Sequence, residues 1–268
     1  MDKKKRIRFI VICSCILAAL LVGVFLTADP AKEEEPINIV MKDAVLHETT
    51  KVCLPVVGEV NPAAASAFIV TGIVLVFSLI VRIFFIPRFT DAPGRFQLLL
   101  EQAVGIFDGL ATSNSPHRHK FLGAYVFTAG TYIFVGTMFE LLGIMYPTTS
   151  GGSIALPAPL ADINGAISMG VFSYLVILSG GIAGNKVKGV LNTLKDFSLP
   201  ISMSFRLFGA LLSGALVTEL VYYYLTTSFI IPVFVAVMFT MLHALIQAYV
   251  LTMLTALFYG EVSIKEEE

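Results

Sequence analysis

Six long apolar runs dominate this chain of 268 residues. A helix needs about 20 apolar residues to cross a bilayer core, where every backbone polar group must be satisfied within the protein. Hydrophobic residues make up 56% of the chain and charged residues 14%, whereas soluble domains carry about 25% charged residues. We therefore predict an all-α integral membrane protein of about six helices. The runs are Phe9–Ala28, Ser66–Ile86, Phe121–Tyr146, Gly165–Gly184, Leu199–Leu225 and Phe229–Tyr259.

Basic residues indicate which ends of these helices face the cytoplasm. The first run follows a basic flank between Lys3 and Arg8, whereas the segment 147–163, predicted to lie outside, has no Lys or Arg. Since cytoplasmic loops are enriched in Lys and Arg, we expect a multi-pass protein of the inner (plasma) membrane with both termini cytoplasmic. The alternative for the first run is a cleaved signal peptide, which the large Leu26 near its end disfavours.

Four parts follow from this pattern. They are an N-terminal anchor or signal-like span at 1–28, an acidic extracytoplasmic segment at 29–65, a membrane domain at 66–262 and a cytoplasmic tail at 263–268. Within the membrane domain, Asp91–Gln97 predicts a turn followed by an amphipathic helix to about Ala111, with Pro93 at the helix start.

The last two runs are longer than a membrane requires. An upright helix over Phe229–Tyr259 would measure about 46 Å, against a core of about 30 Å. We expect this run and Leu199–Leu225 to form a strongly tilted antiparallel hairpin, because only residues 226–228 connect them. The alternative is an ordinary span with a surface helix attached.

Small residues recur along the first helix of this hairpin. Gly209/Ser213 and Ala210/Gly214 each have a spacing that lets helices approach closely in lipid. This surface can serve a partner protein or ordinary packing within the chain.

Arg206 lies in the same helix, seven residues after Leu199. An arginine in the membrane is costly, and its guanidinium stays protonated, so it cannot carry protons. We expect either a fixed positive barrier or a partner for a carboxylate on another protein. The alternative is an arginine that extends to the cytoplasmic surface.

Three further polar residues of the hairpin are candidates for an ion path. His243 and Gln247 are four residues apart, so they share a face of the last helix. Glu219 lies about 220° around its helix from Arg206, which argues against a salt bridge and favours two separate aqueous approaches. A packed core histidine and a water-facing glutamate are the alternatives.

Outside the hairpin the candidates are weaker. Glu140, Asp162 and Asn164 can line an outer vestibule, although Asp162 and Asn164 are also typical of a helix start. His117 and His119 flank Arg118 in a polar loop and are expected to be solvated rather than metal ligands.

Catalytic motifs are missing from the sequence. There is no GxxxxGK[ST], HExxH or CxxC pattern, so we predict no catalytic residue, metal site or cofactor, and no ATP hydrolysis by the chain alone. The net charge of −1 gives no indication of nucleic-acid binding.

Four sequence segments resemble a known family. Ser204–Gly209, followed about forty residues later by Leu245–Ala256, closely resembles the C-terminal half of the F-type ATP synthase subunit a. Pro159–Asn164 and Ala92–Gln97 resemble earlier segments of that family, in the same order, and the match runs from about residue 65 to 262.

The resemblance implies a role in ATP synthesis. Arg206 would be the essential stator arginine facing the rotating c-ring, with Gln247 beside it on the adjacent tilted helix. Two aqueous half-channels would carry protons or sodium ions to and from the ring carboxylate, and Arg206 would prevent a direct leak. The implied partners are the c-ring, the subunit b peripheral stalk, the rest of the F-type ATP synthase and membrane lipid.

The chain departs from the family's usual residues at four positions. Ala210 stands where the family usually has Asn, and Ala215 and Thr240 stand where it often has an acid–histidine pair. Asn192 replaces a common Glu in the cytoplasmic access region.

A shift of one helical turn would compensate for part of this change. Glu219 and His243 lie one turn beyond Ala215 and Thr240, and His243 is expected opposite Ala210. We hypothesise that the polar groups of the outer half-channel are displaced by that turn.

Two other functions fit the sequence less well. A stand-alone secondary ion transporter often contains paired repeats and broken helices, and the sequence shows no internal repeat. A purely structural membrane scaffold leaves the cost of Arg206 unexplained.

Overall fold

The computed structural model describes residues 51–54, 58–149, 151–223 and 231–264, together with positions 11, 14, 15 and 18. Most of the predicted first span and acidic segment lies outside these residues, as do the predicted connection 226–228 and positions 265–268. In the described part, five helices are long and apolar enough to cross a membrane. This confirms the prediction of an all-α membrane protein.

Most of the first of these helices is exposed at the surface of the molecule. α3 (Pro62–Ile80) begins after Asn61, whose side chain accepts a hydrogen bond from the Ala63 amide at 3.0 Å. It continues through a π-helical turn, η1 (Val81–Phe85), and a 3-10 turn, η2 (Ile86–Arg88). Only 6% of its most apolar stretch is buried within the protein. Such a surface is suited to lipid rather than water.

The next two helices pack against each other. α4 (Arg95–Asn114) is the expected amphipathic helix, although it begins after Gly94, so Pro93 lies just outside it. α5 (His119–Glu140) ends six residues before the predicted Tyr146. The helix stops there because Gly143 adopts a φ of +57° and the chain then enters a strand.

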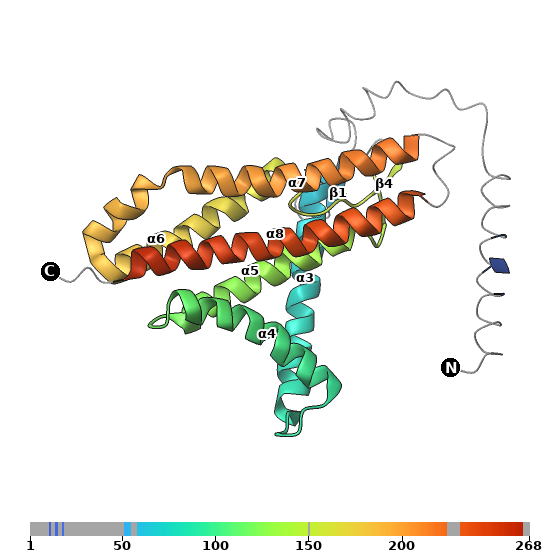
Figure 1. Ribbon diagram of the computed structural model, residues 1–268. Helices are drawn as coiled ribbons and strands as arrows, with labels where there is room; N and C mark the ends of the chain where they lie inside the picture. The colour runs from blue at the N-terminus through green and yellow to red at the C-terminus, as the bar shows by residue number, and fades with distance from the viewer. Residues whose placement is uncertain are drawn as a thin grey trace.

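Two short antiparallel hairpins, absent from our prediction, lie near the first residues of α3 (Figure 1). Their strands are β1 (Val52–Leu54), β2 (Gly58–Val60), β3 (Met145–Pro147) and β4 (Ser153–Ala155). An isolated bridge between Val52 and Thr148 joins the two hairpins. Strands of three residues carry too little alternation to be recognised in a sequence.

α6 (Ile163–Lys195) is interrupted where the predicted fourth span ends. Asn185 and Lys186 depart from helical geometry, and Lys186 has a φ of +52°. The two halves fold back on each other, because Gly189 contacts the Gly181 carbonyl and the Tyr174 hydroxyl donates to the Thr193 carbonyl at 3.0 Å. The predicted span Gly165–Gly184 therefore corresponds to the first half only.

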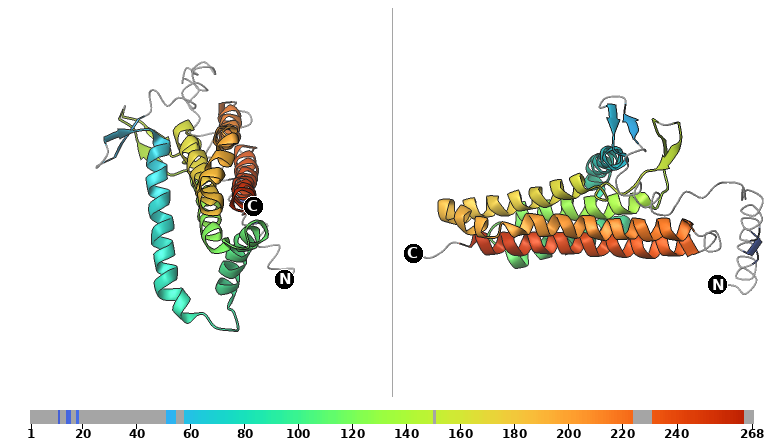
Figure 2. Two further views of the ribbon diagram at one scale, coloured as in Figure 1. Left: turned by 90° about the vertical axis from the view of Figure 1, so that its left-hand side faces the viewer. Right: turned by 90° about the horizontal axis from the view of Figure 1, so that it is seen from above.

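The last two helices form the predicted hairpin. α7 (Ser198–Tyr223) and α8 (Ile231–Ser263) run antiparallel, and α8 is about 50 Å long by its helical rise. α8 continues four residues beyond the predicted end at Tyr259. In Figures 1 and 2, α3 runs steeply across the long axes of α7 and α8, so the two long helices are strongly tilted relative to α3.

The main core lies where α8 packs along α5 and α6 and α7 packs along α6. Leu122 of α5, Ile177 of α6, Leu207 of α7 and Tyr259 of α8 are each at most 1% exposed. A second cluster, which includes Val52, Val70 and Phe139, packs under the hairpins and fixes α3 to α5.

Candidate functional site

Arg206 projects from the bundle rather than into it. Its side chain is exposed on α7, whereas Met203, Leu207 and Leu211 on the buried face are at most 4% exposed. Within the described part of the chain, the guanidinium makes neither an ion pair nor a hydrogen bond. Its charge is therefore directed toward the surroundings of the subunit.

The small residues of α7 divide between two surfaces. Gly209 and Ser213 are exposed beside Arg206, and a methyl group added at Gly209 would have no neighbour within 4 Å. Gly214 is partly buried, and a methyl group there would lie 3.3 Å from His243 Nδ1. One small-residue face therefore serves packing against α8, and the other is open.

Gln247 lies on the buried side of α8. Its side chain is 5% exposed, and Ala244 and Ala248 on the same helix are also buried. Among the described residues, no hydrogen bond connects Gln247 with Arg206. Its Oε1 atom is buried without a partner in that part of the protein. An amide oxygen in this state favours a polar ligand or water, because burying it unpaired costs about 1–3 kcal/mol.

His243 lies at the contact between α7 and α8. The side chain is partly buried, and its ring centroid is 5.9 Å from that of Phe239. His243 was expected opposite Ala210, and its imidazole lies against Gly214, one turn further along α7. The side chains of the two helices lean along their axes, which displaces the contact from a simple count of residues.

Glu219 lies in α7, as the sequence indicates, but its side chain is not among the described parts of the structure. Thr240, where the family resemblance implies a histidine, is 9% exposed. The described hairpin therefore brings Gly214 and His243 together. The role of the Glu219 side chain in an ion path stays a prediction.

Asp162 caps the start of α6. Its carboxylate accepts hydrogen bonds from the amides of Asn164 and Gly165 at 3.1 and 3.4 Å. It also accepts from the Asn61 side chain at 3.1 Å, which connects the first residues of α3 and α6. The capping interpretation of Asp162 is confirmed, and Asn164 lies inside the helix with an exposed side chain.

The remaining candidates lie on other helices. Glu140 is the last residue of α5 and is partly buried. Asn192 lies in the second half of α6, where its Oδ1 accepts from Lys195 Nζ at 2.9 Å. Glu140 and Asn192 therefore lie on α5 and α6, and neither belongs to the two helices of the hairpin.

Known proteins identify the family. The family model described as ATP synthase A chain matches residues 65–260, well over half of the chain. The chain belongs to this family. An ATP synthase subunit a from Histophilus somni (strain 129Pt) is 26% identical over 229 residues, which cover 69% of this chain and 85% of that protein. ATP synthase subunit a proteins from Glaesserella parasuis and Cereibacter sphaeroides are 26% and 25% identical, over 69% and 62% of this chain and 85% and 68% of their own lengths.

Membership of the ATP synthase A chain family gives the broad role. The protein is a multi-pass membrane subunit of an F-type ATP synthase and serves ion translocation in its membrane sector. It accordingly associates with the rest of that complex. The matched range contains most of α3, all of α4 to α7 and nearly all of α8, so both Arg206 and Gln247 lie within it.

Sequence reasoning missed one polar cluster. His117, expected to be solvated, is exposed, but it and Arg118 also contact two distant helices: His117 reaches the last residue of α8, and Arg118 reaches Ala183 beside the break in α6. Nothing in their local sequence indicates this, because the contacted carbonyls lie 65 and 146 positions away in the chain.

Proposed function

We propose that the chain translocates protons or sodium ions through two half-channels against a rotating c-ring, with Arg206 as the fixed charge between them. The exposed position of Arg206 carries this proposal. A guanidinium that projects from α7 without a partner in the described residues is available to a carboxylate of another subunit. The ring carboxylate would lose its ion near Arg206 and form a transient ion pair there.

The same charge explains how the half-channels stay separate. A permanently protonated group in a medium of low dielectric constant repels a cation that approaches it. Ions would therefore cross only on the moving ring carboxylate. The open small-residue surface at Gly209 and Ser213 supports this arrangement, because it allows a ring helix to approach Arg206 closely.

Polar residues away from Arg206 would form the two routes. We assign Glu219 and His243 to the outer half-channel, with Gln247 beside the exchange point and Glu140 and Asn164 toward the outer mouth. Asp162 would hold that mouth by capping α6. Asn192 would line the cytoplasmic access.

The proposed function also implies which subunits surround the protein and how it lies in the membrane. The c-ring would contact the α7 face with Arg206, and subunit b of the peripheral stalk would hold the stator. The protein would lie in the plasma membrane with both termini in the cytoplasm, as the distribution of Lys and Arg favours.

The test is ATP-driven ion pumping by the complete synthase in vesicles. Arg206→Ala should reduce pumping to background while the complex still assembles, because the exposed Arg206 side chain makes no hydrogen bond or ion pair with the described residues. Arg88→Ala removes an exposed arginine from η2 and serves as the matched control, with pumping expected to be unchanged. Normal pumping by Arg206→Ala would overturn the proposal.

A further inference from the structure

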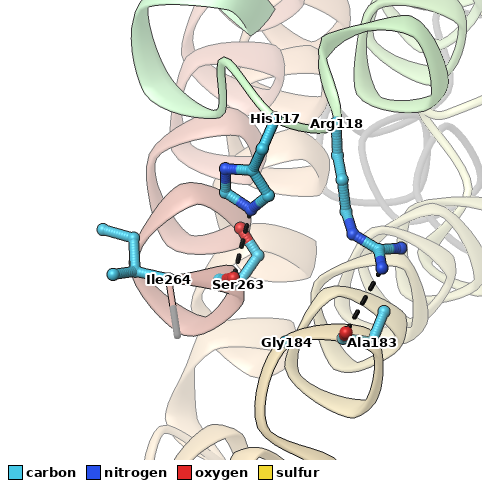
Figure 3. A pocket seen from close by; sticks show the side chains of 6 residues that line it. All are labelled: His117, Arg118, Ala183, Gly184, Ser263 and Ile264. Carbon is cyan, nitrogen blue, oxygen red and sulfur yellow. Dashed lines mark hydrogen bonds between the residues drawn. The ribbon is translucent and has the colours of Figure 1, made fainter. Parts of the chain in front are cut away.

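A pocket opens where the α4–α5 loop, the break in α6 and the last turn of α8 meet. Its volume is about 370 Å³. Six residues from these three elements form its walls: His117, Arg118, Ala183, Gly184, Ser263 and Ile264. Figure 3 shows the His117 and Arg118 side chains extending in parallel from the loop, one toward α8 and the other toward α6.

Backbone carbonyls hold these two side chains in place. His117 Nε2 lies 3.1 Å from the Ser263 carbonyl oxygen, and Arg118 Nη2 donates to the Ala183 carbonyl at 3.2 Å. A guanidinium has five N–H donors, and in the described residues Ala183 is the one acceptor for the Arg118 side chain. Most of the donors of Arg118 therefore remain available at the exposed rim.

The charge around the pocket is positive. Lys186 and Lys188, just after the break in α6, and Lys120, two residues after Arg118, are all exposed. Glu261 is exposed on the last turn of α8, about 60° around the helix from the direction of Ile264, and the four cations Arg118, Lys120, Lys186 and Lys188 outnumber it.

Exposed apolar side chains flank the same place. Phe121, one turn beyond Arg118 along α5, is 55% exposed, and Ile182 and Ile264 are 51% and 60% exposed. Because α5 is a membrane-spanning helix, Phe121 lies deeper toward the hydrocarbon than Arg118. A positive rim above an apolar wall is complementary to a molecule with an anionic head and an acyl tail. A free anion would contact the basic rim and leave the apolar side chains uncovered.

We propose that this pocket binds the phosphate group of an anionic phospholipid, with Arg118 as the principal contact. Arg presents planar donors to phosphate oxygens, and basic pockets between helices at the cytoplasmic surface are suited to lipid headgroups. Lys186 and Lys188 add attraction at longer range. The site is separate from Arg206, so a negative result here leaves the proposed ion-translocating function untouched.

Native mass spectrometry of the full chain in detergent micelles tests the proposal, with phosphatidylglycerol and phosphatidylcholine as the probes. Phosphatidylglycerol should be retained more strongly. Arg118→Gln should weaken its retention about fivefold, the usual contribution of one basic residue near an anionic surface. Arg88→Gln removes the same charge away from the pocket and should change retention less than Arg118→Gln does.

A lysine double variant and a competition with inorganic phosphate complete the test. Lys186→Gln with Lys188→Gln leaves the described hydrogen bonds intact and should also weaken retention, which provides a test if Arg118→Gln fails to fold. Inorganic phosphate in large excess should not displace the lipid. Equal retention of the two lipids, equal losses in the Arg118 and Arg88 variants, or full displacement by phosphate would each overturn the proposal.

Discussion

Gly214 of α7 lies against the imidazole of His243 on α8, so that a methyl group at Gly214 would stand 3.3 Å from Nδ1. This spacing is tighter than ordinary van der Waals contact, so a methyl group at position 214 would require the imidazole to move by a few tenths of an ångström. The contact fixes His243 at the boundary of the two helices that carry Arg206 and Gln247.

Gly214→Ala is expected to disturb this contact. Alanine normally stabilises a helix interior by about 0.5–1 kcal/mol relative to glycine, but here the methyl group would displace the imidazole. Gly72→Ala is the matched control, since a methyl group at Gly72 of α3 meets nothing within 4 Å. Gly72→Ala should unfold at the same temperature as the wild type or at a higher one, and it should pump normally. Gly214→Ala should show no increase in unfolding temperature and should pump more slowly. Identical behaviour of the two variants would contradict the prediction.

Glu219→Ala and His243→Ala should each slow ATP-driven pumping on the order of tenfold to a hundredfold, because a positioned proton-transfer group contributes about that much or more. Initial rates in reconstituted vesicles measure the effect. Returning the imidazole to the family position, in His243→Ala combined with Thr240→His, should recover part of the rate. If both single variants pump normally, the outer half-channel does not use the displaced residues.

Asp162→Ala should lower the free energy of unfolding by about 1 kcal/mol, because α6 loses its N-terminal cap. Asp162→Asn retains a good capping side chain and removes the charge, so both stability and pumping should be kept. Thermal unfolding in detergent and pumping in vesicles give the two readouts. A stable Asp162→Asn protein that no longer pumps would show that the carboxylate itself serves the ion path.

Lys186→Gly should raise the free energy of unfolding by about 1 kcal/mol, since a side chain at φ +52° and ψ −124° is strained and glycine is not. Lys188→Gly removes the same side chain two residues later, in helical backbone, and should lower stability by about 1 kcal/mol. The two unfolding temperatures should therefore move in opposite directions. A decrease in both would mean that the backbone at Lys186 is unstrained.

The main helices and the importance of Arg206 could be predicted from local sequence alone. Helices in lipid must satisfy their own backbone hydrogen bonds, so a long apolar run such as Phe229–Tyr259 specifies both the element and its approximate length. Arg206 stood out for a related reason, because a charge within such a run is costly wherever the helix lies.

Details that depend on distant residues were not accessible in this way. The early end of α5 depends on a three-residue strand pairing of Met145–Pro147 with Ser153–Ala155, and the fold-back of α6 depends on Gly181 meeting Gly189. The register that seats His243 against Gly214 comes from the contact of two helices, and helical periodicity within either one contains no information about it.

The sequence by itself thus determined that the chain is a membrane protein, which of the described segments are long and apolar enough to cross a membrane and where the unusual charge lies, because these follow from the free energy of single residues and helices in lipid. Only the tertiary structure decided that Arg206 faces outward, that Gln247 is buried and that His117 and Arg118 reach the last turn of α8 and the break in α6. Those outcomes depend on which helix faces pack together, and packing is a property of pairs of surfaces that neither segment specifies alone.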